Sequence, residues 1–303
     1  MASKNSWKAN GLLLLTAAIW GGGFVAQRLG MAEIGPFTFN AIRFGIGGAL
    51  LLVYLRAQGK LRAEPGKLRG ELLAGAAAGV LLFLGSYLQT AGMIYTTAGK
   101  AGFITGLYVV LVPLMGLFWK QKTGLSTWAG ALLAVAGLYL LSFAESAQVN
   151  IGDVLVMVGA FFWAGHVQLI GYLSRRNDPL KVSVYQFFAV TVMSLVAALL
   201  FEETTTQALR QSLWPLLYGG IFSVGVAFTL QVVAQRDAHP AHAAIIFSLE
   251  TVFAGLSGWL ILGEQMAPRA LAGCGLMLAG MILSQVGPYL NLGAARRVNI
   301  LQD

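Results

Sequence analysis

The sequence predicts an all-α membrane protein whose ten transmembrane helices form two inverted five-helix repeats. Three observations lead to this fold class. The charge content is too low for a soluble protein, ten successive apolar runs have membrane-spanning length, and the same residue types recur 143 positions apart. The first observation identifies the solvent, the second gives the number of helices, and the third gives their arrangement.

The composition is that of a chain surrounded by lipid. Of 303 residues, 57% are apolar and only 11% are charged, and the mean hydropathy is +0.72. A soluble domain carries about a quarter charged residues, because it must cover its core with solvated groups. The formal charge of +8 does not indicate a nucleic-acid partner, since Lys and Arg lie almost entirely in short segments between the apolar runs.

Each of the ten apolar runs can cross about 30 Å of hydrocarbon as a helix, which takes about 20 residues. The runs are continuous and rich in Leu, Ala and Gly, whereas the strands of a membrane barrel alternate in polarity. We expect the spans at residues 9–29, 37–55, 71–93, 98–119, 128–144, 151–173, 182–201, 213–235, 240–262 and 270–286.

The distribution of basic residues predicts the orientation of these spans. With the N-terminus in the cytoplasm, fifteen Lys and Arg residues fall on the cytoplasmic side and four on the outer side, while Arg43 lies inside a span. Cytoplasmic connections carry the excess of positive charge in membrane proteins. We therefore expect both termini in the cytoplasm, and a bacterial inner membrane as the location.

Residue types recur 143 positions apart near both ends of the two halves. The matching pairs are Trp20 and Trp163, Pro36 and Pro179, Phe44 and Phe187, Gly130 and Gly273, Leu133 and Leu276, and Ala136-Gly137 and Ala279-Gly280. They predict one repeat over residues 1–146 and a second over 147–303, which includes a cytoplasmic tail. Because five spans are an odd number, the second repeat enters the membrane from the opposite side. A duplication that merely builds a stable bundle is the alternative.

Several short segments carry a family signature. They are residues 39–44, 95–101 and 111–114 in the first half, and residues 234–235, 240–241, 248–254 and 262–264 in the second. Over about residues 10–286 the chain resembles the EamA-type members of the drug/metabolite transporter superfamily. Two positions depart from that pattern: Thr251 replaces a proline, and Lys120-Gln121 replaces Gly-Glu. The resemblance implies a ten-helix metabolite transporter, often an exporter, with a central cavity between the repeats.

Two residues of fully charged type lie deep in the predicted spans, Arg43 in the second and Glu250 in the ninth. Charged groups at such depth are costly unless they face a partner, the bundle interior or water. Arg43 lies about 10 Å from the outer end of its span, and Glu250 about 15 Å from the inner end of its own. We expect either a shared polar cavity or a structural ion pair that joins the two halves.

Other polar or aromatic side chains are candidates for the same cavity. The polar candidates are Asn40, Tyr87, Gln89, His166, Gln168 and Gln231, with Gln186 as a further amide in a span. Each can instead hydrogen-bond a neighbouring helix, and His166 is either a proton carrier or a packing residue. Trp20 and Trp163 form either cavity walls or core. Gly21, Gly22 and Gly23, beside Trp20, are the expected hinge.

The sequence favours one function class over three others. No phosphate-binding loop is present, and no catalytic constellation indicates an enzyme. We expect no cofactor and no metal, because His239 and His242 lack a Cys or carboxylate cluster. We expect a secondary transporter of a small organic solute, an exporter of amino-acid-like compounds. An exporter of cationic amphipathic drugs and a structural or assembly subunit are the alternatives, and the oligomeric state stays open.

Overall fold

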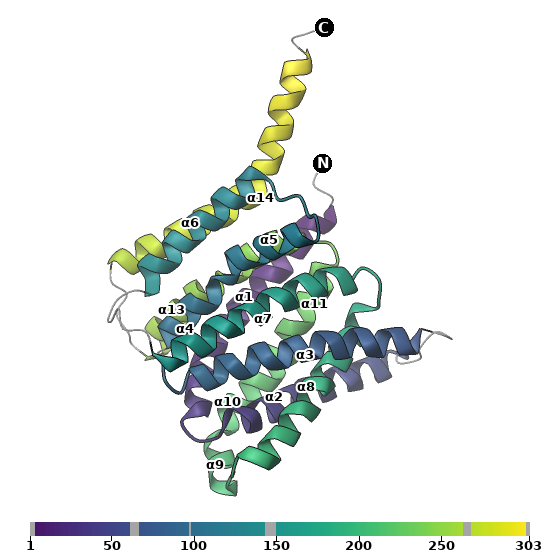
Figure 1. Cartoon of the computed structure of the whole chain (residues 1–303), viewed down its shortest axis with the longest axis vertical. Helices are drawn as coiled ribbons and strands as arrows, with labels where there is room; N and C mark the ends of the chain where they lie inside the picture. The colour runs from purple at the N-terminus through teal and green to yellow at the C-terminus, as the bar shows by residue number, and fades with distance from the viewer. Residues whose placement is uncertain (1–3, 61–66, 97, 143–149, 263–267, 301–303) are drawn as a thin grey trace.

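A computed structural model describes residues 4–60, 67–96, 98–142, 150–262 and 268–300, and all regular structure among them is helical (Figure 1). The predicted repeat boundary at 146/147, the end of the fifth predicted span at residue 144 and the family segment at 263–264 lie outside these ranges. The prediction of an all-α fold is confirmed.

The first half contains α1 (Lys4–Met31), α2 (Pro36–Ala57), α3 (Leu68–Gly92), α4 (Ala98–Gly106), α5 (Tyr108–Phe118) and α6 (Leu125–Ser142). The second half contains α7 (Ile151–Leu173), α8 (Pro179–Phe201), α9 (Thr206–Gln211), α10 (Leu213–Leu217), η1 (Tyr218–Phe228), α11 (Thr229–Gln235), α12 (Pro240–Phe247), α13 (Glu250–Leu262) and α14 (Pro268–Ile300). Eight segments of the described chain are long and apolar enough to cross a membrane, and two shorter apolar helices, in α6 and α14, account for the fifth and tenth spans.

Three predicted spans are not uniform α-helices. The fourth divides at Leu107 into α4 and α5, and the ninth divides at Ser248 and Leu249 into α12 and α13. In the ninth span the Ser248 hydroxyl donates to the Ile245 carbonyl at 2.8 Å, a local bond that competes with the helical pattern. The eighth span is built from α10, the π-helical η1 and α11. These interruptions cluster around the centre of the molecule.

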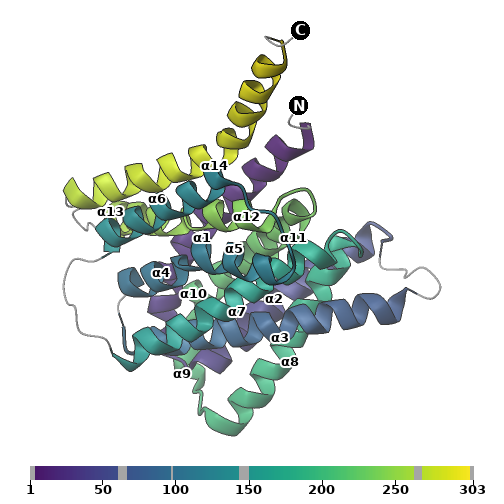
Figure 2. The ribbon, with the colours of Figure 1, turned by 45° about the horizontal axis from the view of Figure 1, so that its top comes forward.

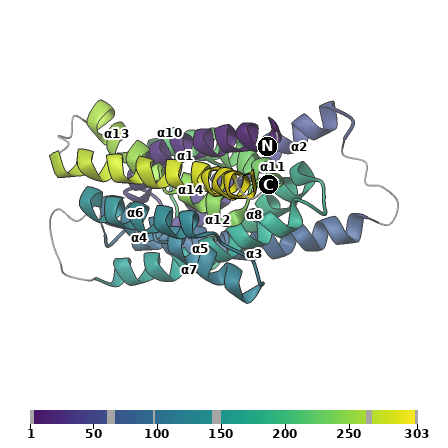
Figure 3. The ribbon, with the colours of Figure 1, turned by 90° about the horizontal axis from the view of Figure 1, so that it is seen from above.

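The pairing of α6 with α14 shows that the two halves run in opposite senses. A Cβ atom added to Gly130 would lie 2.5 Å from the Gly280 carbonyl oxygen, and one added to Gly137 would lie 2.5 Å from that of Gly273. Gly280 is the repeat counterpart of Gly137, and Gly273 that of Gly130. Counterparts therefore contact each other crosswise, as a two-fold axis between antiparallel helices requires (Figures 1 and 3).

The same crosswise contact joins α2 and α8 at the other edge of the molecule. Gly45 faces Thr191, the counterpart of Gly48, while Gly48 faces Phe188, the counterpart of Gly45. The rings of Phe44 and its counterpart Phe187 lie 6.1 Å apart between them. The pseudo-two-fold axis thus passes beside this pair, and the expected inverted repeat is present in the fold.

The remaining spans lie between these two edges. Figures 1 and 2 show α6 and α14 on one side, α2 and α8 on the other, and α1, α3, α7 and the interrupted spans in the middle. The last turns of α14 stand clear of the bundle, and the start of α1 lies at the same end as the close of α14. Below, the membrane side where α1 begins is called the N-terminal side, and the other the opposite side.

Candidate functional site

A buried cavity of about 40 Å³, with room for about three waters, lies between the two halves. Seven of the ten spans contribute to its wall, and most of the lining side chains are buried. The lining residues are Trp20, Phe24, Gln27, Arg43, Gln89, Thr105, Tyr108, Trp163, Val167, Ser223, Phe228, Gln231, Phe247 and Glu250.

Arg43 extends from α2 to the cavity, and hydrogen bonds and aromatic rings fix the position of its guanidinium group. Its Nε donates to Asn40 Oδ1 at 2.9 Å, and Asn40 Nδ2 donates to the Thr90 hydroxyl of α3 at 3.2 Å. The guanidinium carbon lies 5.4 Å from the ring centre of Phe39 and 4.9 Å from that of Phe44. The terminal nitrogens have no protein partner among the described residues, which leaves two donor groups for the cavity.

Glu250 lines the cavity at the break in the ninth span, where this span contacts the divided fourth span. It is the first residue of α13, and Tyr108 is the first residue of α5. The Tyr108 hydroxyl donates to Glu250 Oε1 at 3.0 Å, while Oε2 has no partner among the described groups. A helix break thus exposes one carboxylate oxygen to the cavity and ties the other to the opposite repeat.

The two charges share one cavity without forming an ion pair. Arg43 and Glu250 are 2% and 5% exposed, so neither is solvated by bulk water, and no salt bridge joins them within the described chain. Of the two expectations, a shared cavity and a structural ion pair, the structure has the first. Two buried charges without counterions are costly, which favours a ligand that neutralises both.

One glutamine pair from each half reaches the cavity: Gln27 and Gln89 both line it, whereas Gln235 lies behind the lining residue Gln231. Gln89 Nε2 donates to Gln27 Oε1 at 3.3 Å, and Gln27 Nε2 donates to the Gly23 carbonyl at 3.3 Å. Gln231 Nε2 donates to Gln235 Oε1 at 3.0 Å, and Gln235 Nε2 donates to the Val167 carbonyl at 3.0 Å. Each chain of hydrogen bonds ends at Gln89 or at Gln231. The amide oxygen of that last glutamine has no partner among the described residues.

Phe228 is the centre of the aromatic wall. Its ring centre lies 4.7 Å from that of Trp20 and 5.8 Å from that of Trp163. Trp20 Nε1 donates to the Ser223 carbonyl of η1 at 3.3 Å, whereas Trp163 Nε1 is buried without a partner. Gly85, the repeat counterpart of Phe228, packs against Trp163. The two tryptophans are therefore counterparts in sequence with different surroundings.

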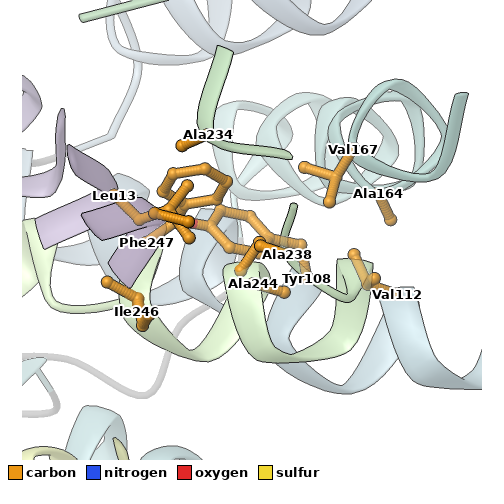
Figure 4. Close-up of a cluster of buried hydrophobic side chains, with 12 residues drawn as sticks. Leu13, Tyr108, Val112, Ala164, Val167, Ala234, Ala238, Ala244, Ile246 and Phe247 are labelled. Carbon is orange, nitrogen blue, oxygen red and sulfur yellow. The ribbon is translucent and has the colours of Figure 1, made fainter. Parts of the chain in front are cut away.

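A dense apolar cluster, shown in Figure 4, contains residues from the parts of α1, α5, α7, α11 and α12 that are nearest the N-terminal side. Most of its members are small, and three of them, Tyr108, Val167 and Phe247, also belong to the cavity wall. The side chains labelled in Figure 4 are Leu13, Tyr108, Val112, Ala164, Val167, Ala234, Ala238, Ala244, Ile246 and Phe247. This cluster closes the cavity towards the N-terminal side.

Six of the ten predicted cavity residues line the cavity: Trp20, Arg43, Gln89, Trp163, Gln231 and Glu250. The other four make contacts elsewhere. Asn40 lies behind Arg43. Tyr87 stacks on Phe37 with ring centres 4.1 Å apart. His166 bonds Gln186 at 2.9 Å, and Gln168 donates to the Val112 carbonyl at 2.7 Å.

The expected hinge at Gly21, Gly22 and Gly23 lies within an unbroken α1. A Cβ added to Gly21 would lie 2.8 Å from the Glu250 carbonyl oxygen, and one added to Gly22 would meet the Tyr218 hydroxyl. Here the glycines allow α13 and η1 to approach α1 closely. A bending role for them stays a prediction.

Eight lining residues were not predicted from the sequence: Phe24, Gln27, Thr105, Tyr108, Val167, Ser223, Phe228 and Phe247. Gln27 and Tyr108 carried a signal, since both are polar side chains within predicted spans. The four apolar residues did not, because a cavity wall and a packed core use the same side chains. Thr105 and Ser223 carried no signal either, because Thr and Ser are common in membrane helices.

His239 and His242 lie at the start of α12, with ring centres 5.7 Å apart. His239 Nδ1 accepts from the Ala241 amide at 3.3 Å, and the Thr127 hydroxyl bonds His242 at 2.9 Å. Burial, and secondarily the positive charge of Arg175, lowers the pKa of His239. Both rings thus have structural partners, and no group of three metal-ligating side chains occurs in the described residues.

Comparison with known proteins gives one consistent result. The sequence model of the EamA-like transporter family matches residues 7–143 and again residues 150–285. An uncharacterized transporter of Archaeoglobus fulgidus is 34% identical, over 89% of this chain and 83% of that protein. The uncharacterized inner membrane transporter YedA of Escherichia coli K12 is 25% identical, over 97% and 95%. One crystal structure shares the fold, with a TM-score of 0.77 at 19% identity, over 96% of this chain and 99% of that chain.

Proposed function

Since this multi-pass membrane protein belongs to the EamA-like transporter family of the drug/metabolite transporter superfamily, a family of transporters and not of enzymes, we propose that it exports a small zwitterionic metabolite of the amino-acid type by alternating access. We place it in the bacterial inner membrane with both termini in the cytoplasm. The excess of basic residues in the corresponding connections and the inner-membrane relative YedA support this location. Export is the direction that the family resemblance favours.

One observation carries the choice of solute: Arg43 and Glu250 line the same buried cavity and are not paired with each other. Free guanidinium nitrogens suit a carboxylate, and a free carboxylate oxygen suits an ammonium group. A zwitterion would neutralise both buried charges at once, whereas a simple cation would leave Arg43 unpaired and a simple anion would leave Glu250 unpaired. The aromatic wall around Phe228 suits the apolar part of such a solute.

The test is counterflow in sealed proteoliposomes, in which labelled amino acids exchange against a panel of unlabelled ones. We expect Glu250→Gln and Arg43→Gln to insert normally and to lower exchange at least about tenfold, because each removes a charge-assisted hydrogen bond worth about 1.5–3 kcal/mol. Arg43→Gln should also reduce the preference for an amino acid over its neutral amide. Glu250→Gln should reduce the preference for an amino acid over its N-acetyl derivative.

Glu71→Gln is the matched control, because Glu71 is a buried carboxylate outside the cavity that pairs with Lys181 at 3.2 Å. This variant should lose thermal stability and keep the solute preference. Unchanged exchange in both cavity variants would refute the zwitterion site. Exchange of cationic aromatic compounds, with amino acids ignored, would point to the drug exporter instead.

A further inference from the structure

The two glutamine pairs have oriented amides. A backbone carbonyl can only accept a hydrogen bond, so the Gly23 and Val167 carbonyls each receive the NH₂ group of a glutamine, Gln27 or Gln235. The oxygen of that glutamine then receives the NH₂ group of the next, Gln89 or Gln231. Each relay therefore ends in an amide oxygen, a hydrogen-bond acceptor, on a residue that lines the cavity.

The relays join corresponding spans of the two repeats, although the middle glutamine lies on the first span in one relay (Gln27) and on the eighth span in the other (Gln235). Gln89 and Gln231 are 142 positions apart, and the carbonyls of Gly23 and Val167 are 144 apart, each within one residue of the repeat spacing. The first relay joins the first and third spans near the opposite side, because α1 and α3 end there. The second joins the sixth and eighth spans near the N-terminal side, where α7 and α11 end. The cavity thus has a glutamine oxygen towards each face of the membrane.

The two oxygens differ in exposure. Gln231 Oε1 is fully buried without a partner, on the side that the apolar cluster of Figure 4 closes. Gln89 Oε1 also has no partner among the described residues, and Gln89 is 6% exposed against 1% for Gln231. Both residues line the cavity, and Gln89 is the more exposed of the two. In an inverted repeat that alternates between two orientations, these surroundings exchange.

We propose that Gln89 and Gln231 are alternate hydrogen-bond acceptors for the ammonium group of the solute, one serving each orientation of the transporter. This inference rests on the proposed function and narrows its substrate class to solutes with a primary ammonium group. An ammonium group has three N–H donors, and the free Glu250 oxygen takes one. The glutamine oxygen on the open side takes a second, and its counterpart takes over when the other side opens.

The test compares an amino acid with its N,N,N-trimethyl derivative, which keeps the positive charge and has no N–H donor. The probe is the amino acid that the wild-type protein exchanges fastest in the counterflow panel. Gln89→Met and Gln231→Met remove the acceptor with little change in volume. Each should lower the preference for the ammonium form about tenfold. Gln89→Glu and Gln231→Glu keep an acceptor oxygen and should retain the preference, even if the methionine variants fold poorly.

The sidedness of the effect separates solute binding from a structural role. In proteoliposomes of known orientation, Gln89→Met should raise the KM for solute offered from the opposite side, and Gln231→Met the KM from the N-terminal side. Gln186→Met is the matched control, because Gln186 is a buried glutamine that bonds His166 away from the cavity. This variant should lose stability only.

Two failures can be told apart. If the methionine variants at both positions keep the preference for the ammonium form over the trimethyl form, while Glu250→Gln loses the preference for an amino acid over its N-acetyl derivative, the glutamine acceptors are refuted and the zwitterion transporter stands. If the wild-type protein exchanges no amino acid, or if Glu250→Gln keeps the wild-type preference for an amino acid over its N-acetyl derivative, the proposed function itself is refuted.

Discussion

Arg43 shows how one residue is placed in a membrane interior at tolerable cost. Asn40, one helical turn earlier, accepts from its Nε, and the rings of Phe39 and Phe44 lie beside the guanidinium. Arg favours such stacked, hydrogen-bonded sites because its planar fork is pre-organised. The contacts use one edge of the fork and leave the terminal nitrogens for a ligand. Asn40 is thus a positioning residue for Arg43.

We predict that Asn40→Leu lowers thermal stability in detergent, because a buried Nε without an acceptor costs about 1.5–3 kcal/mol. It should also raise the KM for solute, since the guanidinium is no longer held in one orientation. Asn40→Asp keeps the acceptor oxygen and should restore the stability, but its negative charge would pair with Arg43, so the KM should stay raised. Loss of stability in Asn40→Leu with an unchanged KM would reduce Asn40 to a packing role.

At this scale the sequence predicted the charged part of the site better than the rest. Arg43 and Glu250 were identifiable because a charge inside an apolar span needs a compensating environment. Gln168 and His166 are also polar side chains within spans, but they hydrogen-bond neighbouring helices and do not line the cavity. One sequence does not distinguish these two outcomes, since both require a polar side chain at membrane depth. Phe228, which joins the aromatic wall, was indistinguishable from core.

Among the helices, the two divided spans have the largest consequence for the site. Both begin their second part with a cavity residue, Tyr108 in α5 and Glu250 in α13. From the sequence we expected continuous spans here. Gly106 directly precedes the first break, whereas no Pro or Gly lies at Ser248, Leu249 or the residues next to them. The family pattern has a proline where this chain has Thr251, and the ninth span divides near that position without it. The breaks depend on tertiary contacts that periodicity does not encode.

The crossing of α6 and α14 gives a prediction about elements. Gly137→Ala should destabilise the protein by about 1–3 kcal/mol, because the new methyl group would lie 2.5 Å from the Gly273 carbonyl oxygen and 2.6 Å from Met277 Cγ. Thermal unfolding in detergent, followed by size-exclusion chromatography, measures the loss.

Gly275→Ala, in α14 but with no atom near its added Cβ, is the control. It should hold or raise the unfolding temperature, because Ala is the better helix former by about 1 kcal/mol. Equal behaviour of the two variants would show that the helices do not cross at these glycines.

At the scale of the whole molecule, an even number of spans brings both ends of the chain to one side. The start of α1 and the close of α14 lie at the same end of the bundle (Figures 1 and 2), and the count of basic residues predicts that this end faces the cytoplasm. We predict that a fluorescent protein that folds only in the cytoplasm is bright when fused to either terminus. A periplasmic phosphatase fused at the same points should be inactive. An active phosphatase at either end would overturn the orientation.

The mismatch between Gly85 and Phe228 bears on the whole transport cycle. If the repeats were identical, reversing the molecule about its pseudo-axis would give a state of equal free energy. A benzyl side chain in one repeat and a hydrogen atom in the other remove that equality, as does the π-helical turn beside Phe228. In the proposed alternating-access cycle, one orientation is then in excess without solute, by about tenfold for each 1.4 kcal/mol of difference. Solute arriving at the less populated face binds with its apparent affinity reduced by the fraction of molecules that can accept it.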